Sequence, residues 1–488
     1  MANALMLQGT GSDVGKTVLV AGLCRALSNR GLSVLPFKPQ NMSNNAAATD
    51  DGGEIGRAQW LQALACGAMP SVHMNPVLLK PQSETGSQVV VHGKVRGTAK
   101  GRDYQKLKAT LLDAVLHSYH HLQAQCDFVL VEGAGSPAEI NLRAGDIANM
   151  GFATAARVPV VLVGDIDRGG VIASLVGTHT ILPDADKAMI VGFLINKFRG
   201  DVSLFDDGLT AVTDFTAWPS FGVVPHLPMV SRLPAEDSVA LERIVNRDTS
   251  AKLKVAVPVT GRIANYDDLD PLVAEADVDV VFVRDGEPWP VRADIIVLAG
   301  SKSTIADLEV IRRNGWDDAI IAHAKRGGAV FGICGGYQML GTSIADPHGL
   351  EGPAQTVAGL GLLQVETVMQ QAKTVRNTQA QSVAFSTPLQ GYEIHLGETR
   401  GADCDRAFAV VDGRAEGATS ANGTVTGTYL HGVFSSGPFR RAWLGQFGAT
   451  SDGKDQRERV QQALDELADA LEAKLDIDAM LRAAHTFV

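Results

Sequence analysis

Short, unbroken apolar runs recur along the chain, and they limit its fold more than any other feature. In the first half they are LMLQG, SVLPF, FVLVEG, VPVVLVGD and IVGFLIN, beginning at Leu5, Ser33, Phe128, Val158 and Ile190. Continuous rather than alternating apolarity is typical of strands covered on both faces, as in a parallel sheet flanked by helices. The stretches between the runs are long enough to hold those helices. We therefore predict an α/β fold.

The same rhythm restarts in the second half of the chain. Its runs are LKVAVPV, VDVVFV, DIIVLAG and GAVFGIC, beginning at Leu253, Val278, Asp294 and Gly328. Between the two series, residues 225–251 include a polar segment with no strand character. Because such a break marks a domain boundary, we predict an α/β domain at 1–228, a linker at 229–251 and a second α/β domain at 252–445.

The last segment, 446–488, has a different pattern. Its apolar residues recur at steps of three and four among charged residues: Val460, Leu464, Leu467, Leu471 and Leu475. A stripe of this kind covers one face of an amphipathic helix. We predict a helix that packs against the rest of the chain, with a partner-binding helix as the weaker alternative.

Composition excludes several classes of function. The chain has 488 residues, too many for a single small binding module, and its 43 basic and 54 acidic side chains give a net charge of −11. A net-acidic chain repels polyphosphate, so nonspecific nucleic-acid binding is disfavoured. Any anionic ligand must then be held by local arginines and lysines.

Cysteine usage and hydropathy indicate the compartment. The five cysteines are scattered and include no CxxC pair, which supports neither a disulfide framework nor a structural zinc site and favours a reducing environment. No apolar run reaches the ~18 residues of a membrane-spanning helix, and the N-terminus shows no charged leader with a cleavage site. We expect a cytoplasmic protein with no membrane partner.

A glycine-rich loop follows the first apolar run. It reads GTGSDVGKT from Gly9 to Thr17 and leads into the helical pattern VLVAGLCRAL. In a phosphate-binding loop, backbone N–H groups face a triphosphate, a lysine neutralises its outer phosphates, and a hydroxyl joins Mg²⁺. We assign the last two roles to Lys16 and Thr17, and take Gly11 and Gly15 as the loop glycines. ATP and Mg²⁺ are the expected cofactors, although the loop is one residue longer than the strict pattern.

Carboxylates end two later runs. FVLVEGAG places Glu132 at the carboxyl end of a strand, where α/β sheets gather their ligands and where a carboxylate can hold the Mg²⁺ of a nucleotide. Asp165 and Asp167, in LVGDIDRGG, compete for that role, and any of the three could instead cap a helix. We predict Glu132, together with Thr17, as the metal ligands.

One cysteine has the setting of a nucleophile. In GGAVFGICGGYQMLG, Cys334 lies between Gly332 and Gly336, at the junction of a predicted strand and helix. Flanking glycines permit the sharp turn that exposes a nucleophile above a sheet, the helix N-terminus favours thiolate, and nearby backbone N–H groups can form an oxyanion hole. The other four cysteines lack this setting.

A thiolate nucleophile needs a base, and His431 has the best context among twelve histidines. It lies in GTYLHGVF, after a short β-like run about a hundred residues beyond Cys334. His117, His120 and His121 fall on a predicted helix and are more typical of a solvated surface. We predict that Cys334 and His431 form an amide-hydrolysing pair.

Long motifs covering nearly the whole chain resemble the cobyric acid synthase family, glutamine-dependent amidotransferases of the cobalamin pathway. They are FKPQNMSNN (37–45), GGEIGRAQ (52–59), NPVLLKP (75–81), VEGAGSPAEINL (131–142), DIANMGFA (146–153), DIDRGGV (165–171), NKFRGD (196–201), GICGGYQMLG (332–341), GYEIHLG (391–397) and YLHGVF (429–434). So many long motifs in the same order make the resemblance specific.

The resemblance implies a fold, a reaction and two substrates. The first domain would be a P-loop ATPase resembling dethiobiotin synthetase, and the second a class I-type glutaminase with Cys334 as nucleophile and His431 as base. Ammonia from glutamine would amidate the b, d, e and g carboxylates of adenosylcobyrinic acid a,c-diamide to give adenosylcobyric acid. Each carboxylate would first be activated by ATP as an acyl phosphate, with Asp146 as a polar group beside it. Because class I enzymes carry a Glu where this chain has Val433, we expect a Cys-His dyad.

Corrinoid carboxylates need cationic partners, since a guanidinium pairs with them bidentately. The candidates that fall in the matching motifs or beside them are Arg57, Lys80, Arg143, Arg168 and Arg199. Each is individually more often a solvated surface charge. Asn41 and Asn44, in a polar loop after a strand, are weaker candidates.

Three alternatives stay open on the sequence. Cobyrinic acid a,c-diamide synthase has the same domain pair but amidates other carboxylates, and PQNMSNN and EIGRAQ favour cobyric acid synthase over it. CTP synthase would retain the carboxylate after the histidine. A nucleotide-switched binding protein would leave Cys334 with only a structural role, and a partition-type ATPase of that class would carry a lysine at Gly11.

Overall fold

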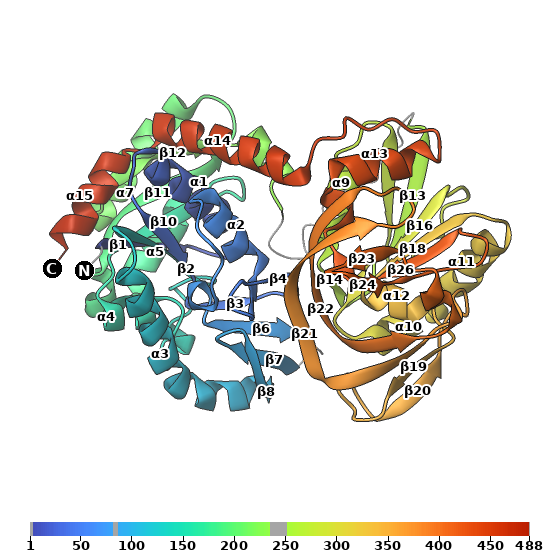
Figure 1. The fold of residues 1–488 in the computed structure, drawn as a ribbon. Helices are drawn as coiled ribbons and strands as arrows, with labels where there is room; N and C mark the ends of the chain where they lie inside the picture. Colours follow the sequence, from blue (N-terminus) through green and yellow to red (C-terminus); the bar gives the residue numbers. More distant parts are fainter. Residues whose placement is uncertain (1–2, 82–85, 235–250, 488) are drawn as a thin grey trace. The chain divides into compact units, whose positions relative to one another are not determined.

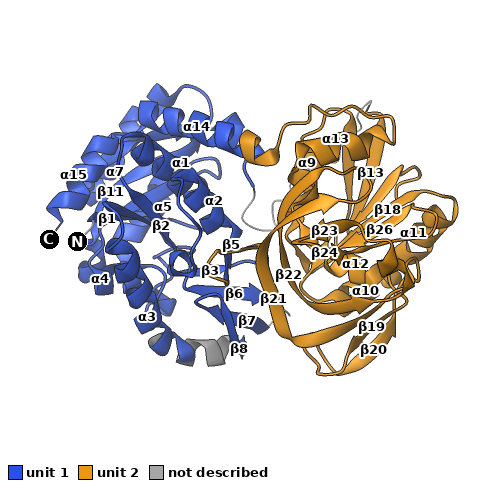
Figure 2. Ribbon diagram, viewed as in Figure 1, with its two compact units in different colours: residues 1–43, 53–234, 460–488 blue, residues 44–52, 235–459 orange. Residues whose placement is uncertain are grey.

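A computed structural model describes residues 3–81, 86–234 and 251–487. The chain divides into two compact units (Figure 2). Unit 1 comprises residues 1–43, 53–234 and 460–488, and unit 2 comprises 44–52 and 235–459. The limits of these units differ from the predicted domain limits: segment 44–52 belongs to unit 2, and the predicted C-terminal segment is divided between unit 2, which includes 446–459, and unit 1, which includes 460–488. Most of the predicted linker, 235–250, lies outside the described residues.

Unit 1 is built on a six-stranded parallel sheet with the order β12-β11-β10-β1-β9-β2 (Figure 1). Its strands are β1 Asn3–Gly9, β2 Val34–Phe37, β9 Phe128–Glu132, β10 Val160–Asp165, β11 Ile190–Phe198 and β12 Ser220–Pro225. The five apolar runs of the first half form five of these strands. The parallel sheet predicted for this half is therefore confirmed, with β12 added at its edge.

Alternate residues of these strands enter two separate apolar cores, as the period of a strand requires. Met6 packs on one face and Leu5 and Leu7 on the other. The Met6 face is covered by α3 Gly101–Gln123, α4 Met150–Ala156, α5 Val171–Ile181 and α7 Asp206–Thr216. The opposite face is covered by α1 Lys16–Asn29, α2 Arg57–Ala65, α14 Gln456–Lys474 and α15 Ile477–Thr486. Burial on both faces explains why the runs are continuously apolar.

A four-stranded sheet also belongs to unit 1. Its order is β3-β6-β7-β8, and its strands are β3 Gln40–Met42, β6 Val77–Pro81, β7 Gly86–Val91 and β8 Lys94–Lys100. The short helix α6 Asp184–Lys187 and the strand β5 Glu54–Gly56 also belong to this unit. No helix in the described part of the chain is long and apolar enough to cross a membrane.

The C-terminal apolar stripe packs within unit 1. Its members, Val460, Leu464, Leu467, Leu471 and Leu475, are all buried in the same core as α1. Burying each leucine stabilises the fold by roughly 1.5–3 kcal/mol. The prediction of a packing helix is confirmed.

Unit 2 has a six-stranded sheet with the order β15-β13-β16-β18-β26-β25, parallel except for β25. Its strands are β13 Leu253–Pro258, β15 Val278–Val283, β16 Ile295–Leu298, β18 Ala329–Ile333, β25 Ala418–Thr419 and β26 Val425–Thr428. The four apolar runs of the second half are β13, β15, β16 and β18. In the described part of this unit the α-helices include α9 Asp270–Val273, α10 Thr304–Arg313, α11 Trp316–Lys325, α12 Gly335–Leu340 and α13 Gly437–Gly445.

Unit 2 contains two further sheets. A seven-stranded mixed sheet contains β19 Ser343–Asp346, β20 Gln355–Ala358, β21 Glu366–Ser382, β22 Pro388–Arg400, β23 Ala409–Val411, β24 Arg414–Glu416 and β27 Leu430–His431. A short antiparallel pair joins β14 Ile263–Ala264 to β17 Gly300–Ser301. Strand β4 Ala46–Ala48, from segment 44–52, lies against β21 and β22.

Candidate active sites

The glycine loop of unit 1 joins β1 to α1. Gly15 caps the helix with a φ of 93°, a left-handed conformation that favours glycine, and the Asn196 amide nitrogen lies 2.4 Å from where a Cβ would stand. Asn196 donates to the carbonyl of Val14 at 2.8 Å, which fixes the loop. Gly11 has open space around it. The loop thus presents the N-terminus of α1 at the carboxyl edge of the sheet, the geometry of a phosphate site.

Lys16 and Thr17 begin α1 and point to the neighbouring strand β9. The Lys16 ammonium donates to the carbonyls of Gly11 at 3.3 Å and Gly135 at 3.2 Å. The Thr17 hydroxyl donates to a carboxylate oxygen of Glu132 at 2.7 Å. The structure therefore brings together three of the predicted site residues.

Glu132 is the centre of a buried polar cluster. Its carboxylate, with no exposed surface, also accepts from Lys38 at 2.7 Å and from the Gln62 amide at 2.6 Å. A buried carboxylate must be paired with a cation or accept hydrogen bonds. A bound metal ion could pair with Glu132 in the same way as Lys38 does. The sequence alone did not predict Lys38 or Gln62 as site residues. For Lys38 there was a usable signal, because it directly follows a predicted strand in the motif FKPQN.

A Mg²⁺ ion suits this donor set, because the ion prefers hard oxygen ligands and commonly takes one carboxylate together with phosphate oxygens. Thr17 and Glu132 supply a hydroxyl and a carboxylate oxygen 2.7 Å apart. Among the described residues, no three His, Cys, Asp or Glu side chains form a metal-binding group. The remaining ligands would therefore come from a nucleotide and water.

The two competing aspartates are engaged elsewhere. Asp165 pairs with Lys197 at 2.8 Å and also accepts from the Asp167 backbone N–H at 2.9 Å. Asp167 pairs with Arg199 at 2.6 Å. The Thr17 hydroxyl donates to Glu132, and this contact favours Glu132.

Asp146 forms hydrogen bonds with the protein backbone. Its carboxylate accepts from the N–H groups of Ala148 at 2.8 Å, Asn149 at 3.1 Å and Gly151 at 2.8 Å, at the start of α4. Asn149 in turn accepts from Ala134 N–H at 3.1 Å, beside the carbonyl that holds Lys16. Asp146 thus orders the loop next to the phosphate site, and its predicted role at the reacting carboxylate stays a prediction.

The predicted corrinoid-binding cations lie in different settings. Their contacts include the following: Arg57 stacks over Trp60 at 4.1 Å, Lys80 pairs with Glu54 at 2.7 Å, Arg143 pairs with Asp186 at 2.7 Å, Arg168 pairs with Asp13 at 3.3 Å, and Arg199 pairs with Asp167. Lys80 is buried, whereas Arg168 and Arg199 are exposed. Asn41 donates to Gln59 at 3.0 Å in unit 1, and Asn44 belongs to unit 2. The corrinoid role of these side chains stays a prediction.

Cys334 lies in unit 2 on a sharp turn between β18 and α12. Its φ of 52° and ψ of −106° are strained for a residue with a side chain. A Cβ at Gly336 would lie 2.0 Å from the Leu298 carbonyl oxygen, so only glycine lets the helix approach the sheet this closely. This geometry is that of a nucleophile elbow.

His431 lies on β27 and is joined to a carboxylate that the sequence analysis missed. Its Nδ1 lies 2.7 Å from Asp268, whose other oxygen accepts from Gly432 N–H at 2.6 Å. Burial lowers the pKa of His431, but the charge and hydrogen bond of Asp268, together with a hydrogen bond to Cys334, raise the pKa to about 10. The imidazolium is favoured at neutral pH, and an imidazolium stabilises a neighbouring thiolate.

The triad geometry corrects the expectation of a dyad. The third member of the triad is Asp268, in the segment Tyr266–Leu269, which lies far before His431 in the sequence. Asp268 replaces the Glu that class I enzymes carry at the position of Val433. No local pattern marks Asp268 among the acidic residues of YDDLD. Only the fold brings it to the histidine.

Strand β22 forms one wall of this centre. Tyr392 stacks on the His431 ring with centroids 5.0 Å apart, and the Cys334 thiol donates to the Ile394 carbonyl at 3.6 Å. His395 stacks on Tyr429 at 3.8 Å, and burial lowers the pKa of His395 to about 4. His395 is therefore neutral and adds no positive charge beside the nucleophile.

Two backbone N–H groups are placed for an oxyanion. Gly335 begins α12 directly after the nucleophile, and a Cβ added to it would lie 2.8 Å from the Ser301 nitrogen. Lys302 N–H donates to the Arg262 carbonyl at 2.9 Å, and bonded and non-bonded positions alternate along an antiparallel pair. The Ser301 N–H therefore points away from β14.

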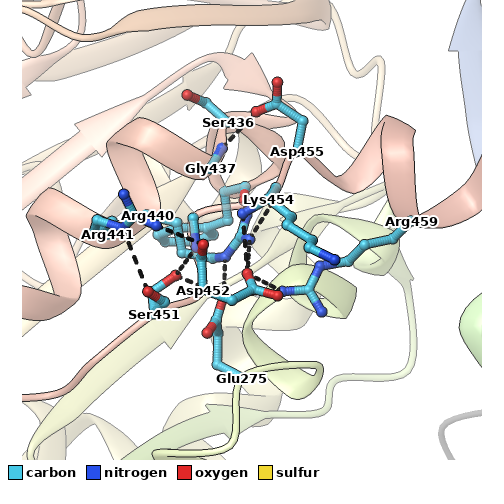
Figure 3. Close-up of polar contacts among 12 residues, drawn as sticks. Glu275, Ser436, Gly437, Arg440, Arg441, Ser451, Asp452, Lys454, Asp455 and Arg459 are labelled. Atoms are coloured by element: carbon cyan, nitrogen blue, oxygen red, sulfur yellow. Dashed lines mark hydrogen bonds and ion pairs between the residues drawn. The ribbon is translucent and has the colours of Figure 1, made fainter.

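A buried arginine, Arg440, bonds to the Glu275 carboxylate and to the segment around Lys454 (Figure 3). Arg440, with no exposed surface, donates at 2.6 Å to the Phe434 carbonyl, which follows His431, and at 2.6 Å to Glu275, which follows Asp268. It also donates to the Lys454 carbonyl at 2.6 Å. Breaking such a buried pair costs about 3–5 kcal/mol, so the network stabilises the packing of the segment after His431 against the segment after Asp268.

Two family models match this chain. Residues 5–240 match the CobQ/CobB/MinD/ParA nucleotide binding domain, and residues 254–439 match the CobB/CobQ-like glutamine amidotransferase domain. A cobyric acid synthase of Rhizobium johnstonii is 65% identical over 98% of this chain and 97% of its own length. The chain belongs to the cobyric acid synthase family. A cobyric acid synthase of Brucella suis is likewise 64% identical, over 99% of this chain and all of its own.

Membership of the cobyric acid synthase family fixes the class of enzyme. Its two matched domains are a P-loop nucleotide-binding domain and a glutamine amidotransferase domain, which confirms the predicted fold class. The chain is a glutamine-hydrolysing ligase of cobalamin synthesis. The alternative hypothesis of a nucleotide-switched binding protein is therefore wrong.

Proposed function

We propose that this cytoplasmic enzyme uses ATP and glutamine to amidate the b, d, e and g side-chain carboxylates of adenosylcobyrinic acid a,c-diamide, giving adenosylcobyric acid. One observation carries the proposal: a chain of the cobyric acid synthase family holds a Cys334–His431–Asp268 centre that can release ammonia from glutamine. The Lys16–Thr17–Glu132 cluster supplies the means to activate the acceptor.

Ammonia release follows from the triad. The Cys334 thiolate attacks the glutamine amide carbon, and the resulting oxyanion lies within reach of the Gly335 and Ser301 N–H groups. The C–N bond breaks as His431 gives its proton to the departing nitrogen, leaving a thioester on Cys334. Water then attacks the thioester, His431 takes up its proton, and glutamate leaves as the thiolate re-forms.

Activation of the acceptor takes place at the phosphate loop. A corrinoid carboxylate oxygen attacks the γ-phosphorus of ATP, ADP leaves, and the acyl phosphate is formed. Ammonia attacks the acyl carbon, phosphate departs with the bonding electrons, and loss of a proton gives the amide. Lys16 neutralises charge on the outer phosphates, and Mg²⁺ held by Thr17 and Glu132 would neutralise the charge that builds up on them.

The Asp268→Asn variant tests the triad. An Asn must turn its NH₂ group toward either His431 or the Gly432 N–H, so it loses one of the two bonds and the charge that favours imidazolium. We expect glutamine hydrolysis to fall by about 10³–10⁴-fold, as for a wrongly held catalytic histidine. Glutamate release measures this effect, and ammonia-dependent amidation should stay unchanged. A glutaminase rate close to wild type would remove Asp268 from the mechanism.

Mass analysis of the product tests the overall proposal. The purified enzyme is incubated with adenosylcobyrinic acid a,c-diamide, ATP and glutamine, and we expect a final product in which four carboxylates have become amides. Omission of ATP should leave the corrinoid unchanged. Amidation of the a and c carboxylates of cobyrinic acid would favour the diamide synthase instead, and the absence of any amide would contradict the proposal.

A further inference from the structure

Asn265 joins the glutaminase histidine to a distant segment of the chain. It has a left-handed conformation, with a φ of 52°, three residues before Asp268. Its side-chain oxygen accepts from the Ala46 N–H at 3.0 Å, and its backbone N–H donates to the Asn45 side-chain oxygen at 2.9 Å. Its amide nitrogen lies 3.5 Å from Nε2 of His431. Segment 44–52 therefore holds Asn265 by two bonds, one to its side chain and one to its backbone.

Segment 44–52 is an excursion of the chain (Figure 2). The residues before and after it belong to unit 1, whereas its own contacts place it in unit 2. Asp50 adds a third anchor by accepting from the Asn377 amide on β21 at 2.8 Å. Seven residues upstream of Asn45, Lys38 contacts Glu132 beside the phosphate loop. The segment thus connects, along the chain, a group at one active site with a group at the other.

The bond from Ala46 fixes which way the Asn265 amide faces. Since the side-chain oxygen is bonded to Ala46 N–H, the NH₂ group is the one that faces His431. An amide NH₂ can only donate, and Nε2 can accept only when it carries no proton. Transfer of the Cys334 proton to Nε2 would place two N–H donors against each other. The seated segment therefore opposes the imidazolium that Asp268 favours, and so lowers the fraction of Cys334 present as thiolate.

We propose that Asn265 is a positioning residue through which segment 44–52 restrains the glutaminase, and that withdrawal of the segment frees His431 to accept the Cys334 proton. The inference rests on the proposed function, since it assigns His431 the role of base. It supplies a means by which events at the ATP-dependent site limit wasteful release of ammonia.

Other groups facing His431 act in parallel. Asp268 on Nδ1 favours the imidazolium, Cys334 favours it as thiolate, Tyr392 stacks on the ring, and His395 lies along the same strand as Tyr392. Asn265 is the neighbour whose side chain is oriented by the segment. Variants at Asn265 and Asn45 should therefore shift the same balance.

The test measures glutamate release from glutamine in the full-length enzyme without ATP or corrinoid. We expect Asn265→Ala and Asn45→Ala each to raise kcat by about tenfold with little change in KM, which is the effect of one hydrogen bond. The acid limb of the kcat/KM profile should move to lower pH, because thiolate forms more easily. Asn314→Ala is the matched control, since it also removes two side-chain bonds, at Val310 and Gly286, and should leave both readouts unchanged.

Asn265→Asp distinguishes positioning from simple structural support. Aspartate tolerates the same backbone conformation and can still accept from Ala46, but it presents an acceptor to His431. We expect the acid limb to move further than in Asn265→Ala. A rate that falls or stays unchanged in the Asn265 and Asn45 variants, or an acid limb that does not move, would overturn the inference. Cys334→Ser assayed in parallel separates the cases: glutamate release that survives it contradicts the proposed function instead.

Discussion

The Cys334→Ser variant should lose glutamine-dependent amidation while keeping amidation with free ammonium at alkaline pH. The hydroxyl of serine is a far weaker nucleophile than a thiolate, and the paired imidazolium no longer faces a matching negative charge. We expect glutamine-dependent turnover to fall by about 10³-fold or more, since removal of a triad nucleophile costs up to 10⁶. Product amides measured with glutamine and with ammonium as alternative nitrogen sources check both parts.

Cys404→Ser is the matched control for that experiment. Cys404 is half-buried in the same unit, where its sulfur lies 3.8 Å from the Tyr337 hydroxyl, and it has neither the strained turn nor a histidine partner. It should leave both reactions near the wild-type rate. If a folded Cys334→Ser enzyme lost the ammonium reaction as well, the two active sites could not have the separate roles assigned to them.

The apolar runs predicted the sheets well because burial on both faces leaves little choice of side chain. All nine runs form strands, and within each half these strands belong to one sheet and pair in parallel. The long hairpin of β21 and β22 gave no such signal. Its first strand, ETVMQQAKTVRNTQAQS, has many exposed polar side chains, because one face of an antiparallel sheet can meet water.

Local geometry could be predicted at both sites, whereas long-range partners could not. The turn at Cys334 and the capping role of Gly15 follow from glycines at fixed spacing. Asp268 and Asn265 lie more than 160 residues before His431, and nothing in their own segment distinguishes them from other polar residues. Those contacts depend on how β14, β17 and β27 come together in the folded unit.

Asp146 shows a different reason for incomplete prediction. Its motif was correctly associated with the ATP-dependent half, but a carboxylate in a glycine-rich loop can serve either a ligand or the backbone. In the structure three backbone N–H groups bind it. The sequence does not indicate which backbone N–H groups a carboxylate will bind, because every residue except proline carries such a donor.

The Lys16→Ala variant should abolish amidation with either nitrogen source and spare basal glutamine hydrolysis. Lys16 is 7% exposed and donates to two carbonyls, so its ammonium is held at the mouth of the loop where outer phosphates would lie. Removing one charge that stabilises the transferring phosphoryl group costs about 10²–10³ in rate. ADP formation and amide formation with ammonium should fall together, whereas glutamate release without ATP should match wild type.

Lys187→Ala is the control for the loss of a positive charge in unit 1. Lys187 pairs with the exposed Asp184 at 3.1 Å within α6, so its removal should change neither reaction. The comparison decides between two views of the phosphate loop. If Lys16→Ala left the ammonium-dependent rate intact, the loop would serve the fold alone, and acceptor activation would have to occur elsewhere in the chain. If both nitrogen sources failed while glutamate release persisted, the loss would lie in acceptor activation, because that is the one step shared by the two routes to the amide.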